Sequence, residues 1–101
     1  MISRQIKESP IAQGEDEQVA YTLTTTPWGS TPSSVAVAIK QLPGLTDTSA
    51  TNLSGNASVN GDVITTPVVK SLVSGAQYRL EVKFTVSGNI MEAWAYVNGE
   101  E

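Results

Sequence analysis

The strongest constraint in this sequence is a strict alternation of apolar and polar residues over residues 77–86. The apolar members are Tyr78, Leu80, Val82, Phe84 and Val86, and every residue between them is polar or charged. Successive side chains of a β-strand point to opposite faces, so the pattern predicts a strand with one face in a core and the other in water. A helix would scatter the same apolar residues around its whole cylinder, which excludes a helical interpretation.

Shorter segments of the same kind predict that the whole chain is rich in β-structure. Turn residues separate them, and Ser87-Gly88-Asn89 predicts a hairpin after the long alternating segment. Asn60-Gly61 predicts a tight hairpin turn, because both residues tolerate positive φ. Pro67 predicts an edge strand or a break within a strand, since it cannot donate a ladder hydrogen bond. The further predicted strands cover residues 2–7, 19–25, 34–40, 50–53, 57–59, 63–70 and 90–98.

The length of 101 residues suits a single domain over residues 1–101 and leaves no room for a second one. The chain has no cysteine and no histidine, so its stability has to come from packing rather than from disulfides or thiolate metal sites. Histidine is also the commonest general base and transition-metal ligand. These observations predict an all-β domain without a bound cofactor or metal.

The charge balance predicts which classes of partner the chain lacks. Its formal net charge is -4, and its six basic residues are scattered rather than gathered in a stripe. A nucleic-acid-binding protein needs a basic surface, so nucleic acid is not expected as a partner. The apolar runs are only a few residues long, and the N-terminal residues contain no apolar segment of a signal peptide. We therefore expect no membrane partner.

One motif resembles the corner between strands E and F of immunoglobulin-like and fibronectin type III domains. It consists of Leu72, Gly75 and Tyr78, which match the Leu, Gly and Tyr of that corner in those families. The resemblance implies an immunoglobulin-like (fibronectin type III-like) two-sheet β-sandwich of about seven strands. It also implies that the Tyr78 hydroxyl returns to the backbone near the corner. An antibody-type domain is not expected, because the usual cysteine pair is absent.

Several motifs together resemble a family of small proteins encoded by tailed bacteriophages and prophages. They are the segments 7–17, 21–23, 28–29, 31–35, 71–75, 78–80 and 87–89. Members of this family resemble immunoglobulin-like sandwiches and are encoded among virion structural genes. The resemblance implies a structural or assembly protein, made in the bacterial cytoplasm and incorporated in a phage or phage-like particle. Its partners would be virion proteins or copies of itself in a homo-oligomer.

The sequence contains few of the residue patterns that enzymes use for catalysis. A nucleophilic serine needs an adjacent base and a prepared oxyanion site, and without histidine the base would have to be Lys, Asp or Glu. No recognised Ser-Lys motif is present, and the resemblance supplies no catalytic residue to transfer. We therefore expect a non-enzymatic protein with no catalytic residues.

Three aromatic residues are the candidates for an interaction surface. Trp94 and Tyr96 share one face of the last predicted strand, and Trp28 precedes the strand over residues 34–40. If the opposite face with its small residues Ala93 and Ala95 packs inward, the two aromatic side chains stand outside, where they would suit a protein interface or a sugar-stacking platform. In the opposite orientation they face the core. Trp28 either contributes to the interface or closes one end of the core.

These observations leave two functions open. The first is the phage or prophage structural protein that the resemblance implies. The second is a secreted or surface-displayed binding module for carbohydrate or protein, with Trp28, Tyr21, Trp94 and Tyr96 as its contacts.

Overall fold

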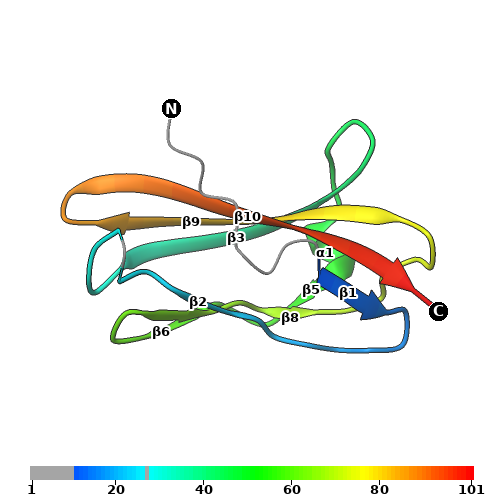
Figure 1. Cartoon of the computed structure of the whole chain (residues 1–101), viewed down its shortest axis with the longest axis horizontal. Coiled ribbons are helices and arrows are strands. Elements are labelled where there is room, and N and C mark those ends of the chain that lie inside the picture. Colours follow the sequence, from blue (N-terminus) through cyan, green and yellow to red (C-terminus); the bar gives the residue numbers. More distant parts are fainter. Residues whose placement is uncertain (1–10, 27) are drawn as a thin grey trace.

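The computed structural model describes residues 11–26 and 28–101, and these residues form β-strands with a single helical turn (Figure 1). The elements in chain order are β1 (Ile11–Gly14), β2 (Thr22–Thr24), β3 (Ser33–Gln41), β4 (Thr46–Asp47), α1 (Ser49–Asn52), β5 (Leu53–Ser54), β6 (Ser58–Asn60), β7 (Val63–Thr65), β8 (Val68–Val69), β9 (Gln77–Val86) and β10 (Asn89–Glu100). The expected all-β class is confirmed. Several strands have only two or three residues, so the described residues contain more strands than the expected seven or so.

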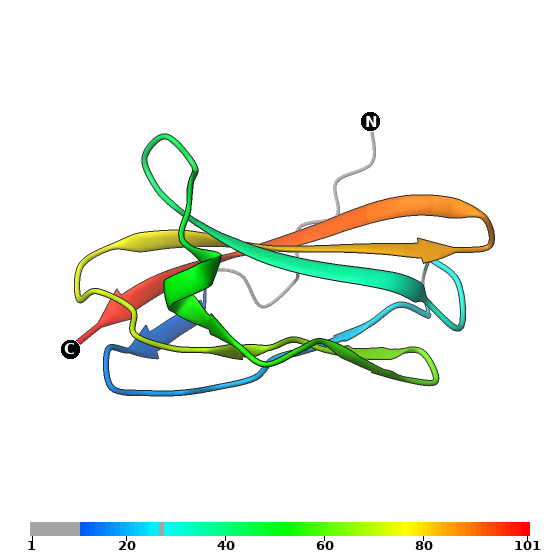
Figure 2. The same ribbon diagram turned by 180° about the vertical axis from the view of Figure 1, so that it is seen from behind.

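The long strands build one layer of the molecule. A five-stranded sheet has the order β1-β10-β9-β3-β4, in which β9 pairs antiparallel with both β10 and β3, and β1 pairs parallel with the end of β10. A three-stranded sheet, β2-β7-β6, and a two-stranded sheet, β5-β8, lie below it in the second layer (Figures 1 and 2). The two layers enclose the core.

The core confirms the alternation that the sequence shows in the longest apolar-polar segment. All five apolar side chains of β9 are at most 2% exposed, and they supply both buried clusters of the core. One cluster gathers around Phe84 with Leu23 and Ile64, and the other around Tyr78 with Ile39 and Val69. Val37 packs against both clusters, so the core is continuous from one end of the sandwich to the other.

The second layer is divided where the sequence contains Pro67. The segment 63–70, predicted as extended chain with an edge or a break at this proline, forms β7 before it and β8 after it. β7 pairs with β2 and β6, whereas β8 pairs with β5. Pro67 therefore marks the point at which the chain leaves one small sheet for the other.

The prediction of a strand over residues 50–53 is wrong for most of that segment. Residues 49–52 form the helical turn α1, and only Leu53 belongs to a strand. The Asn52 side chain is 3% exposed and donates to the carbonyl oxygens of Lys70 at 3.0 Å and Ser71 at 3.1 Å. This buried amide ties the turn to the segment before β9, and such long-range partners override the local pattern.

The hairpin turns are close to their predicted positions. Asn60 pairs with Val63, which makes Gly61 and Asp62 the two turn residues, one position later than predicted. Asn89 pairs with Val86, so that Ser87 and Gly88 form the turn, with φ of 50° and 80°. Two consecutive residues with positive φ are the geometry that a tight β-hairpin requires. The strand predicted over residues 2–7 lies outside the described residues.

The corner before β9 has the geometry that its motif implies. The Tyr78 side chain is 1% exposed, and its hydroxyl accepts a hydrogen bond of 2.9 Å from the backbone N–H of Val73. Leu72 is buried beside it in the same cluster. Gly75 has φ of 86°, a conformation that favours glycine, and its N–H donates to the Gly99 carbonyl oxygen at 2.9 Å. The corner is thereby attached to the end of β10.

Candidate functional site

The candidate site is the face of the five-stranded sheet that points away from the core, here called the outer face. Strands β3, β9 and β10 contribute to it through every second side chain, because the intervening side chains enter the core. Its central residues are Ala36, Ala38, Lys40, Arg79, Glu81, Lys83, Glu92, Trp94 and Tyr96.

Trp94 and Tyr96 lie on the outer face. The residues that alternate with them, Ala93, Ala95 and Val97, are 0% exposed and pack in the core. Of the two orientations that the sequence left open, the structure has the one with the small residues inside. Both aromatic side chains are half-buried, so they belong to the surface of the sheet rather than projecting freely from it.

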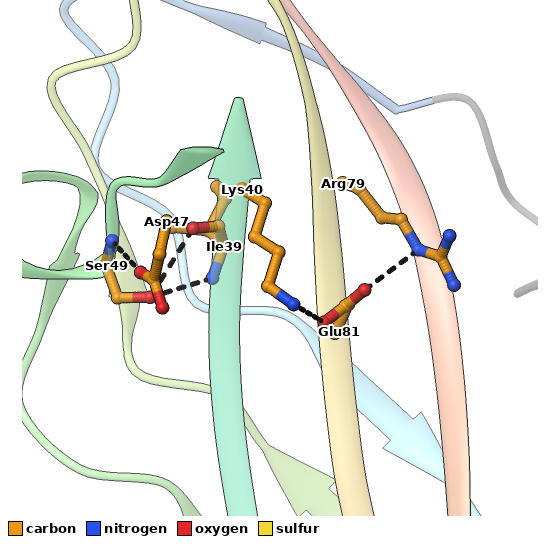
Figure 3. Close-up of polar contacts among 6 residues, drawn as sticks. All are labelled: Ile39, Lys40, Asp47, Ser49, Arg79 and Glu81. Carbon is orange, nitrogen blue, oxygen red and sulfur yellow. Dashed lines mark hydrogen bonds and ion pairs between the residues drawn. The ribbon is translucent and has the colours of Figure 1, made fainter. Parts of the chain in front are cut away.

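A row of charged side chains, Lys40, Glu81 and Arg79, crosses the outer face from β3 to β9 (Figure 3). Lys40 Nζ lies 3.0 Å from Glu81 Oε1, and Arg79 Nε lies 3.1 Å from Glu81 Oε2. The Arg79 contact is an ion pair without hydrogen-bond geometry, since its Nε has no hydrogen-bond partner among the described residues. One carboxylate therefore holds two cations in place on the sheet surface.

Arg79 also connects this charged row to the aromatic residues. Its guanidinium carbon lies 4.8 Å from the centroid of the Trp94 ring, within the range of a cation–π interaction. The strand register brings the groups together, because Glu81 is opposite Trp94 and Arg79 is opposite Tyr96. The Arg79 guanidinium therefore contacts both the Trp94 ring and the Glu81 carboxylate on the surface of the sheet.

A shallow hollow of about 140 Å³ lies beside this constellation. Ala36 and Ala38 line it with their small side chains, and Glu81, Lys83 and Glu92 border it. A hollow with an apolar floor and charged walls of both signs suits a protruding side chain of a partner protein. It is too shallow to enclose a small molecule, since ligand pockets usually start at roughly 300 Å³.

Asp47 and Ser49 secure the edge of the outer face that carries Lys40. The Asp47 carboxylate accepts a hydrogen bond of 2.9 Å from the Ser49 backbone N–H, and Ser49 Oγ in turn accepts one of 3.0 Å from the Ile39 N–H (Figure 3). The hydrogen bonds from the Ser49 backbone and side chain, together with the charge of Lys40, lower the pKa of Asp47. Asp47 is therefore held in its ionised form beside Lys40.

Trp28 does not join the other two candidate aromatic residues. Its ring stacks on Phe84 with a centroid distance of 5.8 Å, and it packs half-buried against the core cluster around that residue. The structure thus separates the three interface candidates into an outer-face pair and a core-packing tryptophan.

The sequence alone does not identify as parts of a site the charged row or the hollow lined by Ala36 and Ala38, here called the alanine hollow. The alternation in β9 places Arg79, Glu81 and Lys83 on one face, which is the only signal the sequence offers. Their partners Lys40 and Trp94 come from other strands, and only the strand register determines which residues meet.

Two absences hold for residues 11–26 and 28–101, the part of the chain that the structure describes. No group of three carboxylates in this part of the chain converges to hold a metal ion. None of its helical segments has the length and hydropathy to cross a membrane. In the comparisons with known proteins, no family model, no curated protein and no solved structure matches this chain.

Proposed function

We propose that this chain is a non-enzymatic, immunoglobulin-like interaction module that serves as a structural or assembly protein of a phage or prophage particle. In this proposal the outer face contacts a virion protein or a second copy of the chain. The single observation that carries the contact function is the arrangement of Trp94, Arg79 and Glu81 beside the alanine hollow. Buried aromatic and arginine side chains supply most of the binding energy in protein interfaces.

The order of the strands supports the immunoglobulin-like part of the proposal. Sandwiches of that class have strands B, E and D adjacent in one sheet and C, F and G adjacent in the other. In this chain β2-β7-β6 and β3-β9-β10 have the corresponding order along the sequence. The bond from the Val73 N–H to the Tyr78 hydroxyl corresponds to the tyrosine corner of the class.

The charge of the outer face favours a protein partner over a sugar. Sugars stack on a free aromatic face, whereas the Arg79 guanidinium already covers one face of the Trp94 ring. Arginine and carboxylate groups on a half-buried surface instead offer paired hydrogen bonds to a complementary polypeptide. The phage setting rests on the resemblance of the sequence motifs and is the part that needs a direct test.

The test has a genomic step and a biochemical step. The genes next to this one should encode portal, terminase, capsid or tail proteins, and purified particles from the same strain should contain the chain by mass spectrometry. A double variant, Trp94→Ala with Arg79→Ala, should fold yet be lost from the particles. Val59→Ala, which changes an exposed residue of β6 in the other layer, should be retained. A gene outside any phage cluster, together with particles that lack the chain, contradicts the proposal.

A secreted or surface-displayed binding module remains the second candidate, because Trp94 is an aromatic side chain at the surface. Its sugar-binding form predicts signals on a glycan array and quenching of Trp94 fluorescence by the bound sugar. The matched variant Trp94→Phe removes this fluorescence signal and leaves that of Trp28. A silent array together with unquenched fluorescence would eliminate the sugar-binding form.

A further inference from the structure

A second surface, separate from the outer face, lies where the two layers of the sandwich part between β1 and β2. A cleft of about 310 Å³ opens there. Leu80 and Val82 form its floor and are almost fully shielded, whereas Ile11, Ala20 and Tyr21 lie at its mouth and are half-buried or exposed. Because an apolar cavity of roughly 150 Å³ can hold a benzene molecule, this cleft has room for about two aliphatic side chains.

The edge of β2 runs along this cleft and has backbone groups that no described residue satisfies. The Thr66 N–H donates to the Tyr21 carbonyl oxygen, and the Thr25 N–H donates to the Asp62 carbonyl oxygen, both at 2.8 Å. Hydrogen bonds in an antiparallel pair alternate along the strand, so residues 21, 23 and 25 bond toward β7. The N–H and C=O groups of Thr22 and Thr24 therefore point away from β7, along the open edge.

The strand that could cover this edge belongs to the other sheet. β1 contributes Ile11 to the cleft but pairs with β10, so no strand of residues 11–26 or 28–101 pairs with this edge of β2. An open strand edge beside an apolar cleft is the arrangement that binds an extended peptide. Main-chain hydrogen bonds supply the affinity, and pockets for alternate side chains supply the selectivity.

The charge at one end of the edge defines the partner further. The turn after β1 contains Glu15, Asp16 and Glu17, which are all exposed and form no ion pair with another described residue. This turn is attached to the cleft, because Gln13 Nε2 donates to the Glu17 carbonyl oxygen at 3.0 Å and the Tyr21 hydroxyl donates to Gln13 Oε1 at 2.5 Å. A basic residue at this end of an added strand would meet these carboxylates.

We propose that the edge of β2 and the cleft beside it receive an extended segment of a partner protein as an added antiparallel strand. The segment pairs with the backbone of Thr22 and Thr24. It places two aliphatic side chains, two residues apart, between the layers opposite Tyr21 and Leu23. A lysine or arginine follows at the end that faces residues 15–17. This surface does not depend on the outer face, so either proposal can fail without the other.

The test titrates the isotopically labelled full chain with the synthetic peptide acetyl-Lys-Val-Thr-Val-Thr-Val-Lys-amide and follows the backbone amides by NMR. The amides of Thr22 and Thr24 should shift and become protected from hydrogen exchange. The same peptide with Glu in place of both Lys residues should bind more weakly, and the difference should shrink at high salt.

N-methylated peptides test the pairing on the unaltered protein. In the proposed antiparallel pairing, the peptide threonines lie opposite Thr22 and Thr24 and bond to them, whereas the N–H groups of its valines point away. Methylation of the two threonine nitrogens should therefore weaken binding at least about tenfold, and methylation of two valine nitrogens should not. The reverse result contradicts the proposed pairing.

A pair of protein variants tests the same backbone pairing by altering the chain instead of the peptide. Thr22→Pro removes the outward N–H at a position where an edge strand tolerates proline, and it should also weaken binding at least about tenfold. Thr22→Val keeps the N–H and should bind as the unaltered chain does.

The proposal is overturned if the peptide produces no shift at Thr22 and Thr24, or if its shifts gather on the outer face. It is also overturned if the Thr22 and Thr24 amides are already protected in the free chain, as a monomer or as a dimer, since the edge would then be occupied before the peptide is added.

Discussion

Tyr78 shows how a single hydroxyl group can maintain the geometry of a corner. The side chain adds its ring to the core, and its oxygen accepts the Val73 N–H at 2.9 Å, across the turn that Gly75 permits. The aromatic ring and the hydroxyl thus have separate functions, which a substitution can separate.

Replacing Tyr78 with Phe should lower the free energy of unfolding by about 1–2 kcal/mol, because the ring stays buried while the Val73 N–H loses its acceptor. Urea denaturation of the two proteins measures the difference. Val73→Ala is the control, since it truncates an exposed side chain and keeps the N–H. It should change stability by no more than about 0.5 kcal/mol. Equal stability of Tyr78→Phe and the unaltered chain would show that the corner does not depend on this hydrogen bond.

Asp47 makes a contribution to stability that depends on pH. Hydrogen bonds from Ser49 lower its pKa in the folded protein below the ordinary 3.8, so the fold favours the ionised carboxylate. The stabilisation is therefore fully present above the unfolded pKa and disappears as the pH falls through the lowered folded value. An NMR titration of the carboxyl carbon should give a midpoint below 3.8.

The same contribution can be measured by denaturation. The difference in unfolding free energy between the unaltered chain and Asp47→Ala should be constant near neutral pH and shrink below about pH 4. A midpoint at or above 3.8 for Asp47 would contradict the lowered pKa, and so would a difference that grows in acid.

At the scale of elements, the last strand depends on a glycine for reasons of space. A Cβ added at Gly99 would lie 2.2 Å from the Val73 carbonyl oxygen, and that oxygen belongs to the backbone of the corner. The Gly99 N–H donates to the Ala76 carbonyl oxygen at 2.8 Å, so the end of β10 and the corner approach each other too closely for a side chain.

Gly99→Ala should therefore destabilise the protein by about 1–3 kcal/mol, since either β10 or the corner has to move. Thermal or urea unfolding would measure it. Gly14→Ala is the matched control, because its added Cβ meets only the flexible Glu17 side chain, at 3.1 Å. A loss of stability at Gly14→Ala equal to that at Gly99→Ala would exclude the close backbone approach as the cause.

On the scale of the whole molecule, the two buried clusters of the core are connected, and we expect the sandwich to unfold as one unit. Val37 packs against both buried clusters, and β9 runs through both of them. Neither cluster can then lose its packing without exposing side chains of the other, which is the physical basis of two-state unfolding in small domains.

This continuity predicts that probes at different places report the same transition. In a Trp94→Phe variant, the remaining Trp28 stacks on Phe84 and reports one cluster by fluorescence. Its urea midpoint should coincide with that of the far-UV circular dichroism signal, which reports all strands together. Two separate midpoints would show that the clusters unfold independently.

Some elements could be predicted from the sequence, and others could not. β9 and the Ser87–Gly88 hairpin follow from local rules, because alternation and turn residues act over a few neighbouring positions. The segment 50–53 does not, since the helical turn α1 depends on hydrogen bonds from Asn52 to residues 18 and 19 positions away. The turn before β7 lies one residue later than predicted, because the pairing of β6 with β7 determines which two residues remain in the turn.

By itself, the sequence determined that the chain is built of strands, which side of β9 enters the core, and where the corner and the Ser87–Gly88 hairpin lie. These properties depend on the periodicity of side chains and on the φ angles that individual residues tolerate. Only the tertiary structure decided that Trp94 faces outward beside Arg79, that Trp28 packs on Phe84, and that the edge of β2 borders an open cleft. The contact of Trp94 with Arg79 depends on the register between β9 and β10, whereas the other two features depend on how segments distant in the chain pack against one another.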